Sequence, residues 1–263
     1  MPKSQALETN SFVNLLPHVQ LIATDMDGTL TQQGQFTPRL LQSLQDLAAA
    51  GLSVVIVTGR SAGWVNGLAH YLPVAGAIAE NGGLFYPKDQ PEPLMLSKIP
   101  DLARHRRQLA DFFQQLQRKF PHLQESTDNR FRLTDWTFDV QGLSQADLQW
   151  LNQTCQSRGW GFTYSTVQCH IKPLMQDKAI GLQQVLQKYF PQVSPAQVLT
   201  VGDSPNDESL FDAATFPHSV GVANVAHYVD QLTHQPAYMT DAPEVAGFCQ
   251  LVERVVKQRG GNR

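Results

Sequence analysis

The stretch LIATDMDGTL, residues 21–30, constrains the fold of this chain more than any other. A short run typical of a buried strand leads directly into two acidic side chains, Asp25 and Asp27. In extended backbone, residues two positions apart point to the same side, about 6.6 Å apart, so both carboxylates crowd the carboxyl end of one strand. Such crowding raises a pKa or requires a cation. An ordinary Asp-Gly turn is the alternative explanation of this motif taken alone.

Strands and helices alternate around this stretch. Thr37 as N-cap, Pro38 at the first helical position and Gly51 as a stop signal predict a helix over 37–51. The other expected core elements are strands at 19–25, 52–60, 74–83, 197–203, 218–222 and 237–240, and helices at 61–70, 177–190, 205–214 and 243–256. This alternation predicts an α/β fold with a doubly wound, Rossmann-like parallel sheet.

The sequence changes character at Tyr86, where the proline-rich stretch YPKDQPEP begins. The expected elements of the next segment are helices at 101–119 and 144–159 and strands within 130–142, 160–166 and 167–173. Short turns between these strands favour a small antiparallel α+β unit. We therefore predict a discontinuous core domain, residues 1–85 and 175–263, with an inserted cap domain over residues 86–174.

Composition argues against several classes of protein. A net charge of -3 without a long Lys/Arg run disfavours a nucleic-acid partner. The first twenty residues lack the apolar core of a signal peptide, and no stretch of about 18 apolar residues could span a membrane. The three cysteines contain no C-x-x-C pair, which disfavours a disulfide framework or a zinc site. We expect a globular protein of the cytoplasm.

Polar groups also follow the second strand and open the helix after the insert. VTGR offers the Thr58 hydroxyl, the Gly59 amide and the Arg60 charge at a helix N-terminus, where phosphate binds readily. Lys178 lies in the first turn of its helix, where a cation opposes the helix dipole unless an anion is nearby. Taken separately, a helix cap at Ser61 and a solvated lysine explain these features equally well.

A further strand end carries VGDSPND, with Asp203 at its end and Asp207 in the next turn. Ser204 as N-cap and Pro205 at the first helical position explain an acid in the first turn. They do not explain Asp203. Because the carboxyl ends of parallel strands meet at the edge where ligands bind, we expect all these motifs at one site.

The ordered set DMDGTL, VTGR, DK and GDSPND resembles the haloacid dehalogenase (HAD) superfamily of phosphohydrolases. The insert after the third strand and ENGG at residues 80–83 resemble the Cof-type members, subfamily IIB, related to sucrose-phosphate and mannosyl-3-phosphoglycerate phosphatases. The resemblance implies a Mg²⁺-dependent phosphatase that acts on a small phosphorylated metabolite, a sugar phosphate or a phosphorylated glycoside.

By the same resemblance, the catalytic residues are Asp25, Asp27, Thr58 and Lys178. Asp25 is the expected nucleophile, which forms an aspartyl phosphate and splits hydrolysis into two easier steps. Asp27 is the expected general acid and base. Thr58 and Lys178 are expected to hold the phosphoryl oxygens.

Oxygen ligands suit Mg²⁺, and the resemblance assigns them to Asp25, the backbone carbonyl of Asp27, Asp203 and, through water, Asp207. The residues expected to bind substrate are Thr58, Gly59, Arg60, Asn81, Lys178 and Asn206 of the core and His170 and Lys172 of the cap.

The cap contribution depends on one face of a strand. In VQCHIKP, the alternation of a strand places Gln168, His170 and Lys172 on one side. Arg130 and Arg132 align similarly in NRFRL. This polar face either roofs the active site or faces solvent, and the sequence leaves both alternatives open.

Three other functions fit part of the pattern. A phosphomutase of the same superfamily passes the phosphoryl group to a sugar instead of water. A phospho-acceptor module such as a receiver domain also groups acids, Thr and Lys, but carries its acceptor Asp after the third strand, where this chain has ENGG. A non-catalytic binding protein would not need the full acidic set. The oligomeric state is left open.

Overall fold

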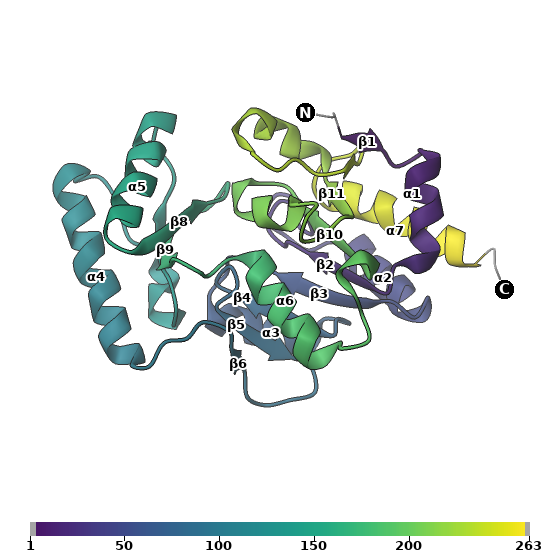
Figure 1. Ribbon diagram of the computed structural model, residues 1–263, viewed down its shortest axis with the longest axis horizontal. Coiled ribbons are helices and arrows are strands. Elements are labelled where there is room, and N and C mark those ends of the chain that lie inside the picture. Colours follow the sequence, from purple (N-terminus) through teal and green to yellow (C-terminus); the bar gives the residue numbers. More distant parts are fainter. Residues whose placement is uncertain (1–3, 261–263) are drawn as a thin grey trace.

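The computed structural model describes residues 4–260 and contains two β-sheets with their helices (Figure 1). The larger sheet has nine strands in the order β1-β12-β11-β10-β2-β3-β4-β5-β6, and the smaller has three in the order β7-β9-β8. Figure 1 shows the smaller sheet at the left with helices α4 and α5, and helices α1 and α7 at the right. The predicted α/β class with a large parallel sheet is confirmed.

The larger sheet is formed by β1 (Gln5–Ala6), β2 (Leu21–Thr24), β3 (Ser53–Val57), β4 (Gly76–Ala79), β5 (Leu84–Pro87), β6 (Leu94–Met95), β10 (Val198–Gly202), β11 (Ser219–Gly221) and β12 (Tyr238–Met239). Its helices are α1 (Asn10–Leu15), α2 (Pro38–Ala49), α3 (Ala62–Tyr71), α6 (Lys178–Tyr189) and α7 (Glu244–Gly260). The smaller sheet is formed by β7 (Trp136–Asp139), β8 (Trp160–Tyr164) and β9 (Gln168–Pro173), with helices α4 (Leu102–Lys119) and α5 (Gln145–Ser157).

The larger sheet is covered on both faces. Ile22 of β2 belongs to an apolar cluster that includes Leu44 of α2 and Phe248 of α7. Its neighbour Leu21 belongs to a second cluster, which includes Leu182 of α6. Adjacent strand residues thus face opposite helical layers, as a doubly wound sheet requires.

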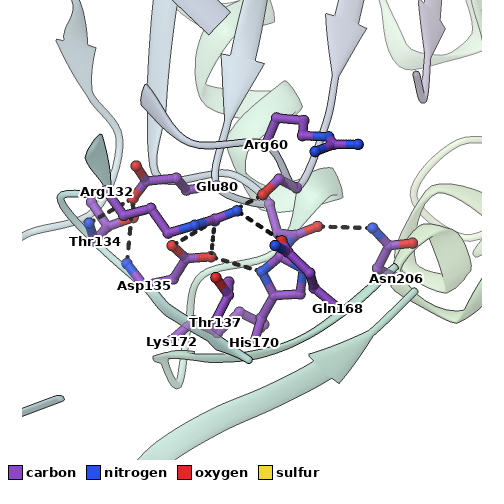
Figure 2. Close-up of polar contacts among 12 residues, drawn as sticks. Arg60, Glu80, Arg132, Thr134, Asp135, Thr137, Gln168, His170, Lys172 and Asn206 are labelled. Atoms are coloured by element: carbon purple, nitrogen blue, oxygen red, sulfur yellow. Dashed lines mark hydrogen bonds and ion pairs between the residues drawn. The ribbon is translucent and has the colours of Figure 1, made fainter. Parts of the chain in front are cut away.

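The smaller sheet has one apolar and one polar face. Cys169 and Ile171 of β9 pack in a third buried cluster with Phe113 of α4 and Leu151 of α5. The alternation of the strand turns His170 to the opposite face, toward the larger sheet (Figure 2). The polar face of β9 therefore roofs the core domain, and the solvent-facing alternative is wrong for His170, whose exposed fraction is 2%.

Two local predictions are wrong. Arg130 lies in a 3₁₀ helix, Thr127–Phe131, and Arg132 directly follows it, so the two arginines do not lie on a strand. Asn129 fixes this turn because its side chain donates to the Thr137 carbonyl and accepts from the Thr137 amide, at 2.7 and 2.9 Å. The helix expected over 205–214 is a shorter 3₁₀ helix, Pro205–Phe211.

The pairing of the edge strands bears on the predicted domain boundary. β5 pairs antiparallel with β4, and β6 pairs antiparallel with β5, so both belong to the larger sheet. The junction predicted at Tyr86 therefore falls inside β5, and the chain leaves the larger sheet only after Met95. At the opposite edge, β1 pairs with β12, an addition that the sequence did not predict.

Within residues 4–260, no helix combines the length and the apolar character needed to cross a membrane.

Candidate active site

The polar strand ends meet at one edge of the larger sheet. Asp25 follows β2, Thr58 follows β3 and Asp203 follows β10. These three strands are direct neighbours and parallel, so their carboxyl ends lie side by side. The Asp25 amide donates to the Val201 carbonyl at 2.8 Å and extends this pairing into the site.

Lys178 joins two of the acids. It begins α6, and its Nζ donates to Asp25 Oδ1 at 2.5 Å and to Asp207 Oδ1 at 2.6 Å. All three side chains are buried. Burial opposes the charge of Lys178, but Asp207 and Asp25 raise its pKa above the ordinary value. In the first turn of α6, Lys178 would oppose the helix dipole, and the two acidic side chains beside it offset this effect.

Three carboxylates gather in a small volume. One oxygen each of Asp25, Asp203 and Asp207 lies within 4.8 Å of the other two. Burial and repulsion from Asp207 raise the pKa of Asp25 to about 7, against the opposing effect of Lys178. Burial, Asp25 and Asp207 also raise the pKa of Asp203 well above its ordinary value. One lysine does not balance three buried acids, so the cluster has the charge and the oxygen atoms that a hard divalent cation requires.

Neighbouring groups fix Asp203 in this cluster. Asn224 Nδ2 donates to Asp203 Oδ2 at 2.8 Å, and the Thr29 hydroxyl donates to Oδ1 at 3.3 Å. Gly28 has a φ of +82°, and a Cβ atom added there would lie 2.5 Å from Asp203 Oδ2. The glycine of DMDGTL is therefore needed both for its backbone conformation and for the space that it leaves to Asp203.

Asp27 makes a different contact. Its carboxylate accepts from Arg60 Nε at 2.8 Å and from Arg60 Nη2 at 2.6 Å. The Asp27 side chain is therefore outside the acidic cluster. The expected metal contact of Asp27 is through its backbone carbonyl and stays a prediction.

Amide groups line the site beside Gly59. Asn206 Nδ2 donates to Asn81 Oδ1 at 3.1 Å, and the Ser204 hydroxyl is 2.8 Å from Asn206 Oδ1. Asn81 Nδ2 is buried without a hydrogen-bond partner within the described residues. A buried donor without a partner is costly, so this amide is available to an oxygen of a bound ligand.

The smaller sheet closes the site from the other side. A cavity is lined from the core by residues such as Asp25, Asp27 and Thr58, and from the smaller sheet by Gln168 and His170. His170 Nδ1 lies 2.8 Å from Asp135 Oδ2 (Figure 2). Residues next to both sheets thus contribute to one cavity.

Arg132 links the smaller sheet to the strand-end loop. Its Nη1 donates to the Gly59 carbonyl at 2.9 Å and to Asp135 Oδ1 at 2.9 Å, and its Nη2 donates to Gln168 Oε1 at 3.0 Å (Figure 2). The guanidinium is fully buried. Arg132 therefore fixes the position of Asp135 relative to the backbone beside Thr58.

Glu80 makes a second link between the sheets. This residue lies in ENGG with a φ of +54° and is fully buried. Its carboxylate accepts from the amides of Ala62 at 2.9 Å, Leu133 at 3.0 Å and Thr134 at 2.6 Å, and from the Thr134 hydroxyl at 2.7 Å. A core carboxylate thus holds the backbone that leads into β7.

The structure brings most of the predicted site residues together. Around one cavity lie Asp25, Asp27, Thr58, Gly59, Arg60, His170 and Asn206. Asp203, Asp207 and Lys178 adjoin it through the contacts above, and Asn81 through its bond to Asn206. Lys172 does not line this cavity: its Nζ donates to the Gln176 carbonyl, and it lines a neighbouring cavity with Asn81 and Lys178.

Sequence reasoning missed Asn224, Glu80 and Asp135 as parts of the site. Asn224 follows β11 at the same sheet edge, so the strand-end rule that found Asp203 could have found it. Glu80 directly follows β4, so the same rule places it at this edge, but its partners in the inserted segment gave no signal. Asp135 gave no signal at all, because its role depends on how the inserted segment packs on the core.

A doubly wound sheet, acids and a lysine at its carboxyl edge, and a second sheet closing over them define a capped α/β enzyme of phosphate-ester chemistry. The model of the haloacid dehalogenase-like hydrolase family matches residues 22–131 and 117–241. The chain belongs to this family.

Known relatives agree with this assignment. The phosphoglycolate phosphatase of Methanothrix thermoacetophila is 26% identical over 242 residues, 90% of this chain and 97% of the relative. The predicted family and the phosphoric monoester hydrolase class are thus confirmed.

Solved structures show the same fold. The Thermoplasma acidophilum protein 0175 has a TM-score of 0.73 at 20% identity, covering 90% of this chain and 98% of its own. The sucrose-phosphatase of Synechocystis, solved with sucrose and phosphate, has a TM-score of 0.68 at 18% identity, covering 90% and 97%. The predicted likeness to sucrose-phosphate phosphatase is confirmed at the level of the fold.

Proposed function

We propose that this HAD-family phosphatase is Mg²⁺-dependent and hydrolyses a small phosphorylated metabolite through an aspartyl phosphate on Asp25. The observation that carries the proposal is the position of Asp25, whose carboxylate contacts Lys178 and shares a cluster with Asp203 and Asp207. Mg²⁺ held by Asp25, Asp203 and the Asp27 carbonyl, with Asp207 behind them, would offset the repulsion between carboxylate and phosphate.

Each residue then has a defined task. Asp25 attacks the phosphorus atom, and the bond from phosphorus to the leaving oxygen breaks. Lys178, the Thr58 hydroxyl and the Asn81 amide are placed to hold the phosphoryl oxygens. Asp27 gives a proton to the leaving oxygen and then removes one from the attacking water, which releases phosphate and restores Asp25.

Asp27 must hold a fixed geometry for this proton transfer. The two hydrogen bonds from Arg60 supply it for the carboxylate form, which removes the proton from water, because a guanidinium binds a carboxylate through a planar pair of N–H groups. When Asp27 takes up the proton that it gives to the leaving oxygen, its protonated oxygen no longer accepts from Arg60. We therefore place Arg60 beside the leaving group and assign it the positioning of Asp27.

The lining of the cavity supports a small phosphorylated substrate, because acidic, basic, hydroxyl and amide side chains of both sheets converge on it. A sugar or polyol phosphate is our first candidate, with a phosphorylated glycoside next. Phosphoglycolate is the third candidate, because the Methanothrix relative bears that name.

The test is phosphate release from a panel of sugar, polyol and carboxylate phosphates in Mg²⁺ and in EDTA. We expect turnover in Mg²⁺, loss in EDTA and recovery on adding Mg²⁺. Folded protein that releases no phosphate from any substrate in Mg²⁺ contradicts the proposal. Product analysis separates a phosphatase from a phosphomutase, which would return a sugar phosphate instead of free phosphate.

An Asp25→Asn variant tests the nucleophile. It should lose about 10⁴-fold or more in kcat, since removal of a nucleophile has effects of this size. An Asp89→Asn variant, changed at an exposed aspartate far along the chain, is the matched control. A cytoplasmic location and the absence of nucleic-acid and membrane partners stay predictions.

A further inference from the structure

Hydrogen bonds hold the buried pair Asp135 and His170 in a fixed arrangement beside the cavity. Asp135 is fully buried and His170 is 2% exposed. Arg132 Nη1 contacts both oxygens of Asp135, at 2.9 and 3.0 Å, and His170 Nδ1 contacts Oδ2 at 2.8 Å. Figure 2 shows the three side chains joined in this order. The ring of His170 is therefore held in one orientation.

The charge of Asp135 decides where the imidazole carries its proton. Burial opposes ionisation, but Arg132 and His170 keep the pKa of Asp135 below its ordinary value, so the carboxylate is ionised near neutral pH. An ionised carboxylate only accepts hydrogen bonds. The contact with Asp135 therefore requires a proton on His170 Nδ1.

The other ring nitrogen is left for a ligand. In the part of the chain that the structure describes, His170 makes its hydrogen bond through Nδ1 alone. The ring lines the cavity with Asp25 and Asp27, and its Cε1 lies 3.0 Å from the position that a Cβ on Gly59 would take. Burial lowers the pKa of His170, so the ring is neutral near pH 7 and Nε2 carries a lone pair.

We propose that His170, oriented by Asp135 and Arg132, is a specificity-determining residue whose Nε2 accepts a hydrogen bond from a hydroxyl of the leaving group. The inference rests on the proposed phosphatase function and narrows its substrate to hydroxyl-bearing phosphates, such as sugar or polyol phosphates. A carboxylate in the same place has no hydrogen to donate and would face a lone pair, so phosphoglycolate fits this position poorly.

The kinetic test compares glycerol 3-phosphate with propyl phosphate, which lacks the hydroxyls, and with phosphoglycolate. The wild-type protein should have a kcat/KM about tenfold or more higher for glycerol 3-phosphate than for propyl phosphate, the size expected for one hydrogen bond. Equal values for these two substrates, or a preference for phosphoglycolate, overturn the inference.

Two variants separate the acceptor from the contact with Asp135. His170→Asn keeps an N–H near the place of Nδ1 but lacks Nε2, so the preference for glycerol 3-phosphate should fall about tenfold. His170→Gln reaches the place of Nε2 with an amide oxygen and should restore part of the preference. Val167→Ala, which changes an apolar residue of the same cavity, should keep the wild-type ratio. A ratio unchanged in His170→Asn contradicts the proposal.

A spectroscopic test does not depend on turnover. In ¹⁵N-labelled Asp25→Asn protein with Mg²⁺, the His170 signals should show a protonated Nδ1 and an unprotonated Nε2. Glycerol 3-phosphate should shift the Nε2 signal, and propyl phosphate should leave it nearly unchanged. A protonated Nε2, or equal shifts with both ligands, overturns the inference. Failure of the proposed function appears differently, as absence of phosphate release from every substrate by wild-type protein.

Discussion

Arg60 donates two hydrogen bonds to the carboxylate of Asp27, from Nε at 2.8 Å and from Nη2 at 2.6 Å. This contact orients the carboxylate of the proposed general acid and base, and both side chains line the cavity. This contact predicts that the loss of kcat caused by a substitution of Arg60 depends on the leaving group of the substrate.

Arg60→Lys keeps a positive charge but loses the planar pair of donors. We expect kcat to fall about tenfold for glycerol 3-phosphate and less for 4-nitrophenyl phosphate, whose leaving group needs little protonation. Steady-state kinetics with both substrates measure this. Arg39→Lys, at an exposed ion pair with Glu253, is the control. An equal loss with both substrates contradicts a role in positioning Asp27.

Gly28→Ala should disrupt the acidic cluster through steric contact with Asp203. We expect a loss of about 100-fold in kcat/KM, because displacements of about 1 Å at a reacting centre have effects of this size. Gly34→Ala is a matched control: both glycines have a positive φ, but nothing lies within 4 Å of a Cβ added at Gly34. Backbone strain is thus common to both variants, and similar losses in both would rule out the steric explanation.

Asp203→Asn should weaken Mg²⁺ binding. A ligand that binds only the folded state at about 100 times its Kd stabilises it by about 2.7 kcal/mol, which corresponds to a rise in Tm of about 5–10 °C for a chain of this size. We expect this rise in wild-type protein and a much smaller one in Asp203→Asn at the same Mg²⁺ concentration. Differential scanning fluorimetry measures it, and Asp89→Asn should respond like wild type.

Glu80→Ala should loosen the contact between the two sheets. The change leaves buried donors of Ala62, Leu133 and Thr134 without an acceptor, at about 1–3 kcal/mol each before water enters. We expect the free energy of unfolding to fall by about 3 kcal/mol and amide exchange at 133–135 to accelerate. An exposed Glu125→Ala variant is the control. Unchanged exchange at these amides would show that Glu80 does not hold the cap.

The stability of the protein should fall with acid partly through His170. Burial lowers its folded-state pKa from the ordinary value of about 6.5. At a pH between the folded-state pKa and the unfolded-state pKa, the unfolded protein binds more protons than the folded protein. The free energy of unfolding therefore decreases as the pH falls. Urea unfolding at pH 7.5 and 5.5 should show a smaller difference for His170→Asn than for wild type. The exposed His227→Asn variant is the control, and a difference as large as that of wild type in His170→Asn would contradict the assignment.

The core site was predictable from local sequence because each motif lies where a buried strand ends. Parallel pairing then brings Asp25, Thr58 and Asp203 together without further information. Asn224 follows β11 at the same edge, so this relationship extends to it as well. The catalytic and binding roles assigned to these residues stay predictions.

The contacts between core and cap were not predictable in the same way. Glu80 binds backbone amides of 133–135, more than fifty positions away, and no periodic pattern marks such a pair. Arg130 and Arg132 alternate like strand residues, but the Asn129 hydrogen bonds fix a 3₁₀ turn that a four-residue pattern cannot reveal. β1 has only two residues, Gln5–Ala6, which is too short for an alternation to be recognised.

The place of β2 in the larger sheet has a consequence for synthesis on the ribosome. β2 lies between β3, which follows it closely, and β10, which begins at Val198. Until that distant segment emerges, one side of β2 has unpaired backbone groups, a template for wrong pairing with other nascent chains. The inserted segment supplies β7, β8 and β9 from one continuous stretch, so we expect it to fold first, before β2 is paired with β10.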